Sequence, residues 1–362
     1  MALWQRVLGW VGLFLLTAVL TIGCSLGSHD ATQNNSSDPA TVADCRRVNH
    51  NFGETEICGQ PENAVVFGMH TLGLLLSLEV QPVGLAMDAD VVGGDVFDDP
   101  ARQIPYLGDR LTTQPGNLGN GSEPSLEKLT AIAPDLILGN RLNEGNYDLL
   151  SQIAPTLLMG DPLVKGQWQK NLRAIAQAFR KEEKAEAVIA QQSARLAEAR
   201  ADLADVVKAH PKLLVLGATR LEEGIFIINT NSYLGELLEG VGFELIVPPA
   251  ADANPGVPIS LETLPELNGA DSIILLGFNR DLGELNAESL DKSVDQPIHD
   301  LLETHQLQTI KASWEKNAIA QNLTASQESR VYFATYARWS LLNNPIGAEL
   351  ILEQLYQFFA VD

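Results

Sequence analysis

The spacing of hydrophobic residues between positions 64 and 159 switches repeatedly between two patterns. Short continuous apolar runs such as Ala64–Phe67 are typical of buried strands, and segments with apolar residues every three or four positions are typical of helices. Strands that alternate with helices form mainly parallel sheets with both faces covered. We therefore predict an α/β lobe with strands at 64–67, 82–86, 135–139 and 156–159, and helices at 71–78, 125–131 and 147–153.

The stretch 167–210 has neither glycine nor proline and is rich in Ala, Glu, Lys, Gln and Arg, which predicts a long helical region. Its apolar residues recur at helical spacing. The charged run 180–184 indicates a break into two helices, of which the second spans roughly 40 Å at 1.5 Å per residue, more than one lobe. A coiled-coil stem is the alternative, but its heptad pattern is short and Ala-rich.

After Pro211 the alternation of strands and helices begins again. We predict strands at 212–218, 224–229, 243–246, 271–277 and 331–334, and helices at 232–239, 261–267 and 345–359. A chain of 362 residues with 45% hydrophobic content is large enough to fill two cores. The predicted fold is therefore α/β, with two Rossmann-like lobes of mainly parallel sheets, at 45–166 and 211–362, joined by a long inter-lobe α-helix within the helical region 167–210.

The amino-terminal 24 residues have the composition of an export signal, with Arg6 followed by the apolar run 7–22 and then Gly23-Cys24. This ending resembles the lipobox of bacterial lipoproteins, which implies that Cys24 is acylated. An uncleaved membrane anchor is the alternative. Residues 25–44 are rich in Ser, Asn, Asp and Thr, so we expect a flexible tether. In both cases the body lies outside the cytoplasm, in the periplasm or on the outer face of the cytoplasmic membrane.

Cys45 and Cys58 are the two remaining cysteines, and in an oxidising compartment a close pair predicts a disulfide. The bridge would close a short loop at the start of the fold. Two thiols alone make a poor metal site, so we expect no bound metal there.

The charge balance is strongly acidic, with 24 Lys plus Arg against 46 Asp plus Glu and a net charge of -22. Such a surface repels nucleic acid, which excludes DNA and RNA as partners. An anionic ligand would have to be held by a local cluster of arginines, because screening removes the far field beyond about 8 Å at physiological salt.

An internal repeat is the most informative feature of the sequence. The segment Ser125-Leu126-Glu127, followed by the strand 135–139, is echoed by Ser260-Leu261-Glu262, followed by the strand 271–277. Each serine is a plausible helix N-cap and places a glutamate in the first turn, where the helix dipole favours a carboxylate. Local stabilisation is the simpler explanation for either glutamate alone, but matching positions in two lobes indicate a paired surface role.

The chain resembles the class III periplasmic binding proteins for ferric siderophores, haem and cobalamin. The segments that carry this resemblance are 63–67 with 75–84, the two Ser-Leu-Glu segments, 133–138, 232–238 and 345–356. The resemblance implies a substrate-binding lipoprotein of an ABC importer that holds an iron(III)–siderophore between its lobes. It further implies that Glu127 and Glu262 meet arginines of the permease. We expect a monomer without a resident cofactor.

Ligands of parallel α/β lobes lie beyond the carboxyl ends of the strands, so residues directly after the strands are the candidates for binding. Arg141, Arg220 and Arg280 occupy three such positions, and guanidinium groups pair well with the oxygens of an anionic iron chelate. Ordinary surface ion pairs are the alternative role for these arginines. The other candidates are Met69 and His70 after the first strand and Tyr336 and Trp339 after the last.

Direct binding of zinc or manganese is the competing hypothesis, since His70 follows a strand. A closed metal site needs several ligands, and the other histidines lie in unrelated segments. A haem or cobalamin ligand would suit the same fold. We find no nucleophile motif, phosphate-binding loop or His-Glu-x-x-His sequence, so the chain is not expected to be an enzyme.

Overall fold

The computed structural model describes residues 44–87, 94–248, 254–279 and 297–359. The predicted signal peptide 1–24, the acylation site Cys24 and all but the last residue of the tether 25–44 lie outside the described residues, as does Arg280. Within the described ranges, no helix combines the length and the apolar character that a membrane span requires.

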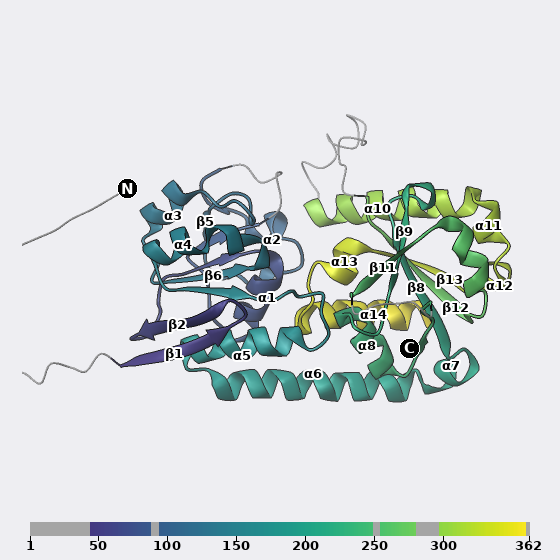
Figure 1. Ribbon diagram of the computed structural model, residues 1–362, viewed down its shortest axis with the longest axis horizontal. Helices are drawn as coiled ribbons and strands as arrows, with labels where there is room; N and C mark the ends of the chain where they lie inside the picture. The colour runs from purple at the N-terminus through teal and green to yellow at the C-terminus, as the bar shows by residue number, and fades with distance from the viewer. Residues whose placement is uncertain (1–43, 88–93, 249–253, 280–296, 360–362) are drawn as a thin grey trace, which may run out of the picture. The chain divides into compact units, whose positions relative to one another are not determined.

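The first sheet has five parallel strands in the order β5-β4-β3-β6-β7, and we call this sheet with its helices the N-lobe (Figure 1). All residues of β3 and β4 are buried, as expected for a sheet covered on both faces. The strands are β3 (Ala64–Phe67), β4 (Gly84–Ala86), β5 (Gly116–Asn117), β6 (Leu136–Asn140) and β7 (Thr156–Met159). The helices are α1 (Met69–Ser77), α2 (Pro100–Gln103), η1 (Gly108–Arg110), α3 (Leu126–Ile132), η2 (Arg141–Asn146) and α4 (Tyr147–Ile153), where η denotes a 3-10 helix.

A disulfide-linked hairpin precedes the N-lobe sheet. Strands β1 (Cys45–His50) and β2 (Gly53–Cys58) are antiparallel, with Cys45 directly opposite Cys58, and the two are joined as predicted. The expected loop between the cysteines is therefore a hairpin. Arg46 donates hydrogen bonds to the carbonyl oxygens of Gln177, Ala178 and Gly59, so the hairpin supplies partners for carbonyls at the end of the helix α5 (Gln167–Phe179).

The second sheet is mixed, with the order β11-β9-β8-β12-β13 and β10 beside β8, and we call it with its helices the C-lobe. Strands β10, β8, β12 and β13 are parallel, whereas β9 and β11 are antiparallel to their neighbours. The strands are β8 (Lys212–Ala218), β9 (Ile225–Ile228), β10 (Glu244–Leu245), β11 (Gly256–Ile259), β12 (Ser272–Gly277) and β13 (Val331–Thr335). The helices are η3 (Leu221–Glu223), α8 (Tyr233–Val241), η4 (Leu261–Leu267), α10 (Ile298–Lys316), α11 (Ala318–Gln321), α12 (Thr324–Gln327), α13 (Tyr336–Ser340) and α14 (Pro345–Phe359).

The long helical region consists of α5, α6 (Glu182–Asp202) and α7 (Ala204–Ala209). The predicted break falls at Arg180, which ends α5 in a left-handed conformation with φ 54°. With 21 residues, α6 is about 32 Å long and packs against α5, α8 and α14, running along both lobes in Figure 1. At Gly240 of α8 a Cβ atom would lie 2.3 Å from Leu196, so the glycine permits close helix contact. The two-lobed α/β fold with an inter-lobe helix is thus confirmed.

The two repeated Ser-Leu-Glu segments differ in helix type. Ser125 caps the α-helix α3, because its Oγ accepts a hydrogen bond from the backbone N–H of Lys128 at 3.3 Å. The helix predicted at 261–267 has these bounds in the structure, but it is the 3-10 helix η4, which contains Pro265. In an α-helix the proline ring would clash with the carbonyl four residues earlier, here that of Leu261, which disfavours an α-helix at this segment.

Candidate functional site

Each lobe has a point in its sheet where the strand order changes direction. In the N-lobe this point lies between β3 and β6, and in the C-lobe it lies between β8 and β12. Open α/β sheets bind ligands in the crevice outside the carboxyl ends of the strands at such points. The residues that follow β3, β6, β8 and β12, and those that follow β13 beside them, therefore make up the candidate site.

The N-lobe edge is polar and tightly fixed. Gly68 follows β3 with φ 88°, a conformation that glycine adopts without strain. The Asn140 side chain donates to the carbonyl oxygen of Phe67 at 3.2 Å and accepts from the Leu142 N–H at 2.8 Å. These bonds tie the ends of β3 and β6 together. They also set the start of η2, where Arg141 is exposed and pairs with Asp161 at 3.6 Å.

Met69 and His70 occupy the first turn of α1 and are almost fully buried, with 6% and 8% of their surface exposed. Nε2 of His70 lies 3.4 Å from Nδ2 of Asn171, and burial lowers the pKa of His70 to about 3. The ring is therefore neutral at physiological pH. These two residues support the N-lobe edge and offer a ligand little surface.

The C-lobe edge is aromatic. The Phe278 ring lies 4.2 Å from that of Tyr336 and 4.6 Å from that of Phe226, measured between centroids, and all three side chains are partly exposed. At Gly217 an added Cβ would lie 2.1 Å from Phe226, so only glycine leaves room for this ring. Tyr336 was predicted from the sequence as a candidate, whereas Phe226 and Phe278 were not. The sequence feature that could have identified them is an aromatic residue within or directly after a predicted strand.

Arg220 follows β8 at the same edge, as predicted. Its Nη1 donates to Oε1 of Glu223 at 2.9 Å, and about a third of its side chain is exposed. Arg141 and Arg220 thus stand on different lobes, each beside a carboxylate of its own lobe. A guanidinium has five N–H donors, so an arginine can bond more than one partner.

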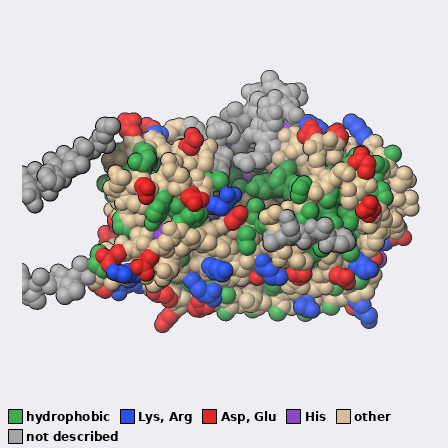
Figure 2. Space-filling view, in the orientation of Figure 1, with side chains coloured by type: hydrophobic (Ala, Val, Ile, Leu, Met, Phe, Trp, Pro, Cys, Tyr) green, Lys and Arg blue, Asp and Glu red, His purple; other side chains and the backbone are tan. Residues whose placement is uncertain are grey.

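Two sets of contacts connect the N-lobe to the region of α13, the helix that begins with Tyr336. The first is made by Asn344, on the segment between α13 and α14, which donates to the His70 carbonyl at 3.2 Å. The second is made by Tyr106, whose hydroxyl donates to Glu303, and Glu303 in turn lies 3.8 Å from Arg338 of α13. The carboxyl edges of β3 and β13 therefore approach each other, and Figure 2 shows a recess between the lobes with hydrophobic side chains beside it.

The prediction that Trp339 lines the site is wrong. This side chain has no exposed surface, its Nε1 donates to Gln354, and its ring stacks on Phe358 with centroids 6.1 Å apart. The two partners belong to α14, which folds over α13 and encloses the indole. Trp339 is a core residue, and Tyr336 is the aromatic of this helix at the candidate site.

The paired glutamates both lie on the surface. Glu127 is exposed in the first turn of α3, and Glu262 is exposed in the first turn of η4. A backbone N–H at the start of η4 and the Ser260 hydroxyl hold the pKa of Glu262 below its usual range. The carboxylate is therefore ionised and available to a cationic partner.

A metal-ligand set can be sought directly among the described residues. Within that part of the chain, the one group of three potential ligands is Cys45, Glu56 and Cys58. Its two sulfur atoms form the Cys45–Cys58 disulfide, so neither is present as a thiolate ligand. His70, the histidine of the metal hypothesis, is not part of this group.

Comparison with known proteins identifies the family. The sequence pattern of the family described as Periplasmic binding protein matches residues 85–336. The chain belongs to this family. Its members are transport binding proteins, so the chain is a binding protein and not an enzyme.

Individual relatives agree along nearly the whole length of the chain. The Bacillus subtilis protein YhfQ is 27% identical over 351 residues, covering 94% of each chain. The Fe(3+)-citrate-binding protein YfmC of the same organism is 24% identical over 361 residues, covering 97% of this chain and 98% of its own. The crystal structure of Staphylococcus aureus SirA complexed with staphyloferrin B has a TM-score of 0.66 at 23% identity, covering 88% of this chain and 99% of that one, which shows a shared fold.

Proposed function

We propose that this periplasmic binding protein captures an iron(III)–siderophore complex between its lobes and delivers it to an ABC permease in the cytoplasmic membrane. The observation that carries this proposal is the pair of unlike edges. Arg141 stands on the polar N-lobe edge, whereas Phe226, Phe278 and Tyr336 stand together on the C-lobe edge, next to Arg220. Aromatic faces can cover the organic shell of a chelate, while guanidinium groups pair with its oxygens.

The proposed binding residues are those of the two edges. Arg141 and Arg220 would donate to chelate oxygens, Tyr336 would contact the organic shell, and Met69 and His70 would hold the N-lobe edge in shape. Arg280 follows the same strand as Phe278 in sequence and completes the proposed arginine set. The names of relatives such as the Fe(3+)-citrate-binding protein YfmC support an iron chelate as the class of ligand.

Delivery requires the protein to be exported and to dock in one orientation. We propose acylation of Cys24 after export, with residues 25–44 as a tether at the outer face of the membrane. Glu127 and Glu262 are the proposed docking residues, because one exposed carboxylate on each lobe fixes orientation as well as adding attraction to a basic permease surface.

A ligand titration tests the proposal. Tryptophan fluorescence of the purified protein is followed while ferric citrate, a ferric trihydroxamate, a ferric catecholate, haem, cobalamin, zinc or manganese is added. We expect saturable quenching by at least one ferric chelate and none by the free metal ions. Saturation by haem or cobalamin alone would redirect the proposal to those ligands, and a response to zinc or manganese alone would overturn it in favour of direct metal binding.

A further inference from the structure

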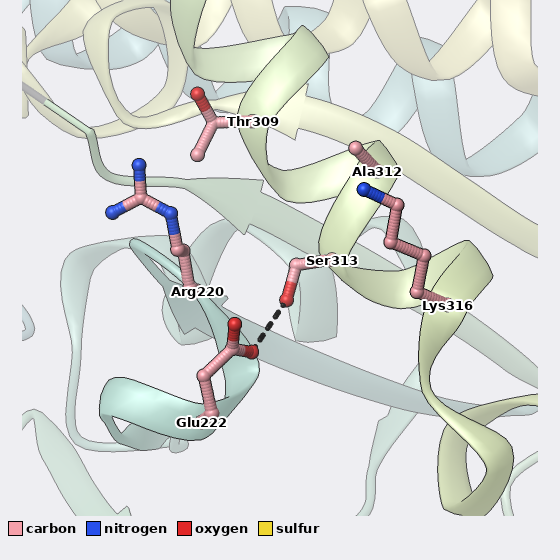
Figure 3. A pocket seen from close by; sticks show the side chains of 6 residues that line it. All are labelled: Arg220, Glu222, Thr309, Ala312, Ser313 and Lys316. Atoms are coloured by element: carbon pink, nitrogen blue, oxygen red, sulfur yellow. Dashed lines mark hydrogen bonds between the residues drawn. The ribbon is translucent and has the colours of Figure 1, made fainter. Parts of the chain in front are cut away.

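A small cavity of about 260 Å³ lies between α10 and η3 of the C-lobe (Figure 3). The residues of α10 that line the cavity recur three or four positions apart, so they lie on one face of the helix. Ile310 and Trp314, on the opposite face of α10, are buried in the C-lobe core and fix the helix. The cavity is lined by Arg220, Glu222, Thr309, Ala312, Ser313 and Lys316.

The wall on the side of η3 is held by hydrogen bonds. The backbone N–H of Leu221 donates to Oγ of Ser313 at 2.9 Å, and that hydroxyl donates to Oε2 of Glu222 at 3.0 Å (Figure 3). These bonds hold the short helix against α10. The cavity therefore has a defined shape, set by contacts between two elements far apart in the sequence.

The cavity adjoins the point where the C-lobe strand order changes. Arg220 follows β8, and Asn279, which follows β12, donates to Oγ1 of Thr309 at 3.3 Å. This leaves the hydroxyl proton of Thr309 available for donation, because its oxygen is the acceptor. A ligand at the carboxyl edge of β8 and β12 would lie next to the cavity.

The charge of the lining is unusual for this chain. Among the lining side chains Arg220 and Lys316 are positive and Glu222 is negative, in a protein of net charge -22, and Arg220 also pairs with Glu223. Within the described ranges, Lys316 takes part in no ion pair, and it is exposed at the end of α10. An ammonium and a hydroxyl donor in a small polar cavity suit a carboxylate.

We propose that this cavity binds an uncoordinated carboxylate arm of the iron chelate, so that the ligand belongs to the carboxylate class of siderophores. This inference rests on the proposed function and narrows it. The cavity is smaller than the roughly 300–1,000 Å³ of sites that enclose a whole drug-sized ligand, so it accommodates an arm and leaves the iron centre between the lobes. Lys316 and Thr309 donate to the carboxylate, and Arg220 adds positive charge.

Two variants of α10 test the assignment. Lys316→Gln removes the charge in the cavity, whereas Lys311→Gln removes a charge from an exposed residue of the same helix that does not line it. Affinities for ferric citrate and for a ferric trihydroxamate without carboxylates are measured by titration of the purified full chain. We expect Lys316→Gln to weaken ferric citrate binding roughly 2- to 5-fold and to leave the trihydroxamate unaffected, as expected for loss of one exposed ion pair. Lys311→Gln should leave both affinities unchanged.

A third variant acts in the opposite direction. Glu222→Gln keeps an acceptor for Ser313 but removes the negative charge, so it should tighten ferric citrate binding. Equal losses for both chelates in Lys316→Gln, or an unchanged affinity for ferric citrate, would overturn the assignment. If the wild-type protein binds only the trihydroxamate, the carboxylate assignment fails while the proposed function stands. If it binds no ferric chelate, the proposed function fails and the assignment fails with it.

Discussion

The two lobes begin a helix with the same three residues but build different helices from them. In the N-lobe, Ser125 caps the α-helix α3, and Thr130 is its fifth residue. In the C-lobe, Pro265 takes the place of Thr130, and the 3-10 helix η4 results. Both segments nevertheless present a glutamate in the first turn. The lobes therefore share the exposed carboxylate and not the type of helix that carries it.

The carboxyl edges of the two sheets also differ, in the kind of contact that holds each edge together. The N-lobe edge is built from hydrogen bonds of Asn140 and a surface ion pair of Arg141, whereas the C-lobe edge is built from contacts among Phe226, Phe278 and Tyr336. An edge fixed by polar contacts can orient a ligand, while an aromatic edge supplies area that excludes water. The repeated fold thus supplies two chemically different edges to the proposed site.

Trp339→Ala gives the largest effect expected on the C-lobe side. Because the indole is fully buried, the change should lower the free energy of unfolding by about 3–5 kcal/mol, the usual cost of a large cavity. Tyr336→Ala, on the same helix but partly exposed, should cost much less stability and weaken chelate binding about 10-fold, the equivalent of about 1.4 kcal/mol. Urea unfolding and ligand titration measure the two quantities. A stable Trp339→Ala protein with specifically weakened binding would return this residue to the site.

Thr130→Pro tests the difference between the repeats. In an α-helix the N–H of residue 130 bonds to the carbonyl of Leu126, so proline there should destabilise the protein by about 3 kcal/mol. Thr130→Ala is the control for the lost hydroxyl, which donates to the same carbonyl at 2.7 Å. The reciprocal change, Pro265→Thr, should alter stability by less than about 1 kcal/mol, as is usual for exposed positions. Urea unfolding measures these changes. If Thr130→Pro and Pro265→Thr lowered the free energy of unfolding equally, the type of helix would not decide the effect of proline on stability.

Replacing Glu127 and Glu262 together by Ala should have the smallest effect on stability. Both carboxylates are exposed, so the melting temperature and the affinity for the chelate should stay close to the wild-type values. Uptake of radioactive iron by cells carrying the double variant should fall to background, because the proposed docking uses one carboxylate on each lobe. Glu123→Ala together with Glu266→Ala, exposed acids near the same helices, provides the matched control. Loss of ligand binding in the Glu127 and Glu262 variant would place these residues in the binding site instead.

Most of the helices and strands could be predicted because their apolar residues recur at the regular spacing of a helix or form a continuous run typical of a buried strand. Strand β3 coincides with its apolar run, and α4 and α14 begin and end at the predicted residues. The helix α10 was not recognised, because buried polar residues interrupt its apolar face. His305 and Gln306 are buried there, and Gln306 accepts a hydrogen bond from the Ala337 N–H at 3.1 Å. The partner of this hydrogen bond lies far away in the sequence, where no local pattern indicates it.

The candidate site could be predicted only in outline. The rule that ligands lie beyond strand ends located Arg141, Arg220 and Tyr336, but it could not reveal that α14 encloses Trp339 or that Phe226 reaches Phe278 across Gly217. These contacts join residues that are between 9 and 52 positions apart in the chain, and tertiary packing decides them. The carboxylate neighbours Asp161 and Glu223 were likewise not identified as the partners of the two arginines.

The most direct measurement for the central proposal is the position of the iron. Crystals of the protein grown with the ferric chelate that binds it are measured at the iron absorption edge, and the anomalous peak is located. We expect one strong peak between the two sheet edges, with Tyr336 on one side and Arg141 on the other. A peak on an outer face of either lobe, or none in crystals of a protein that binds the chelate in solution, would contradict it.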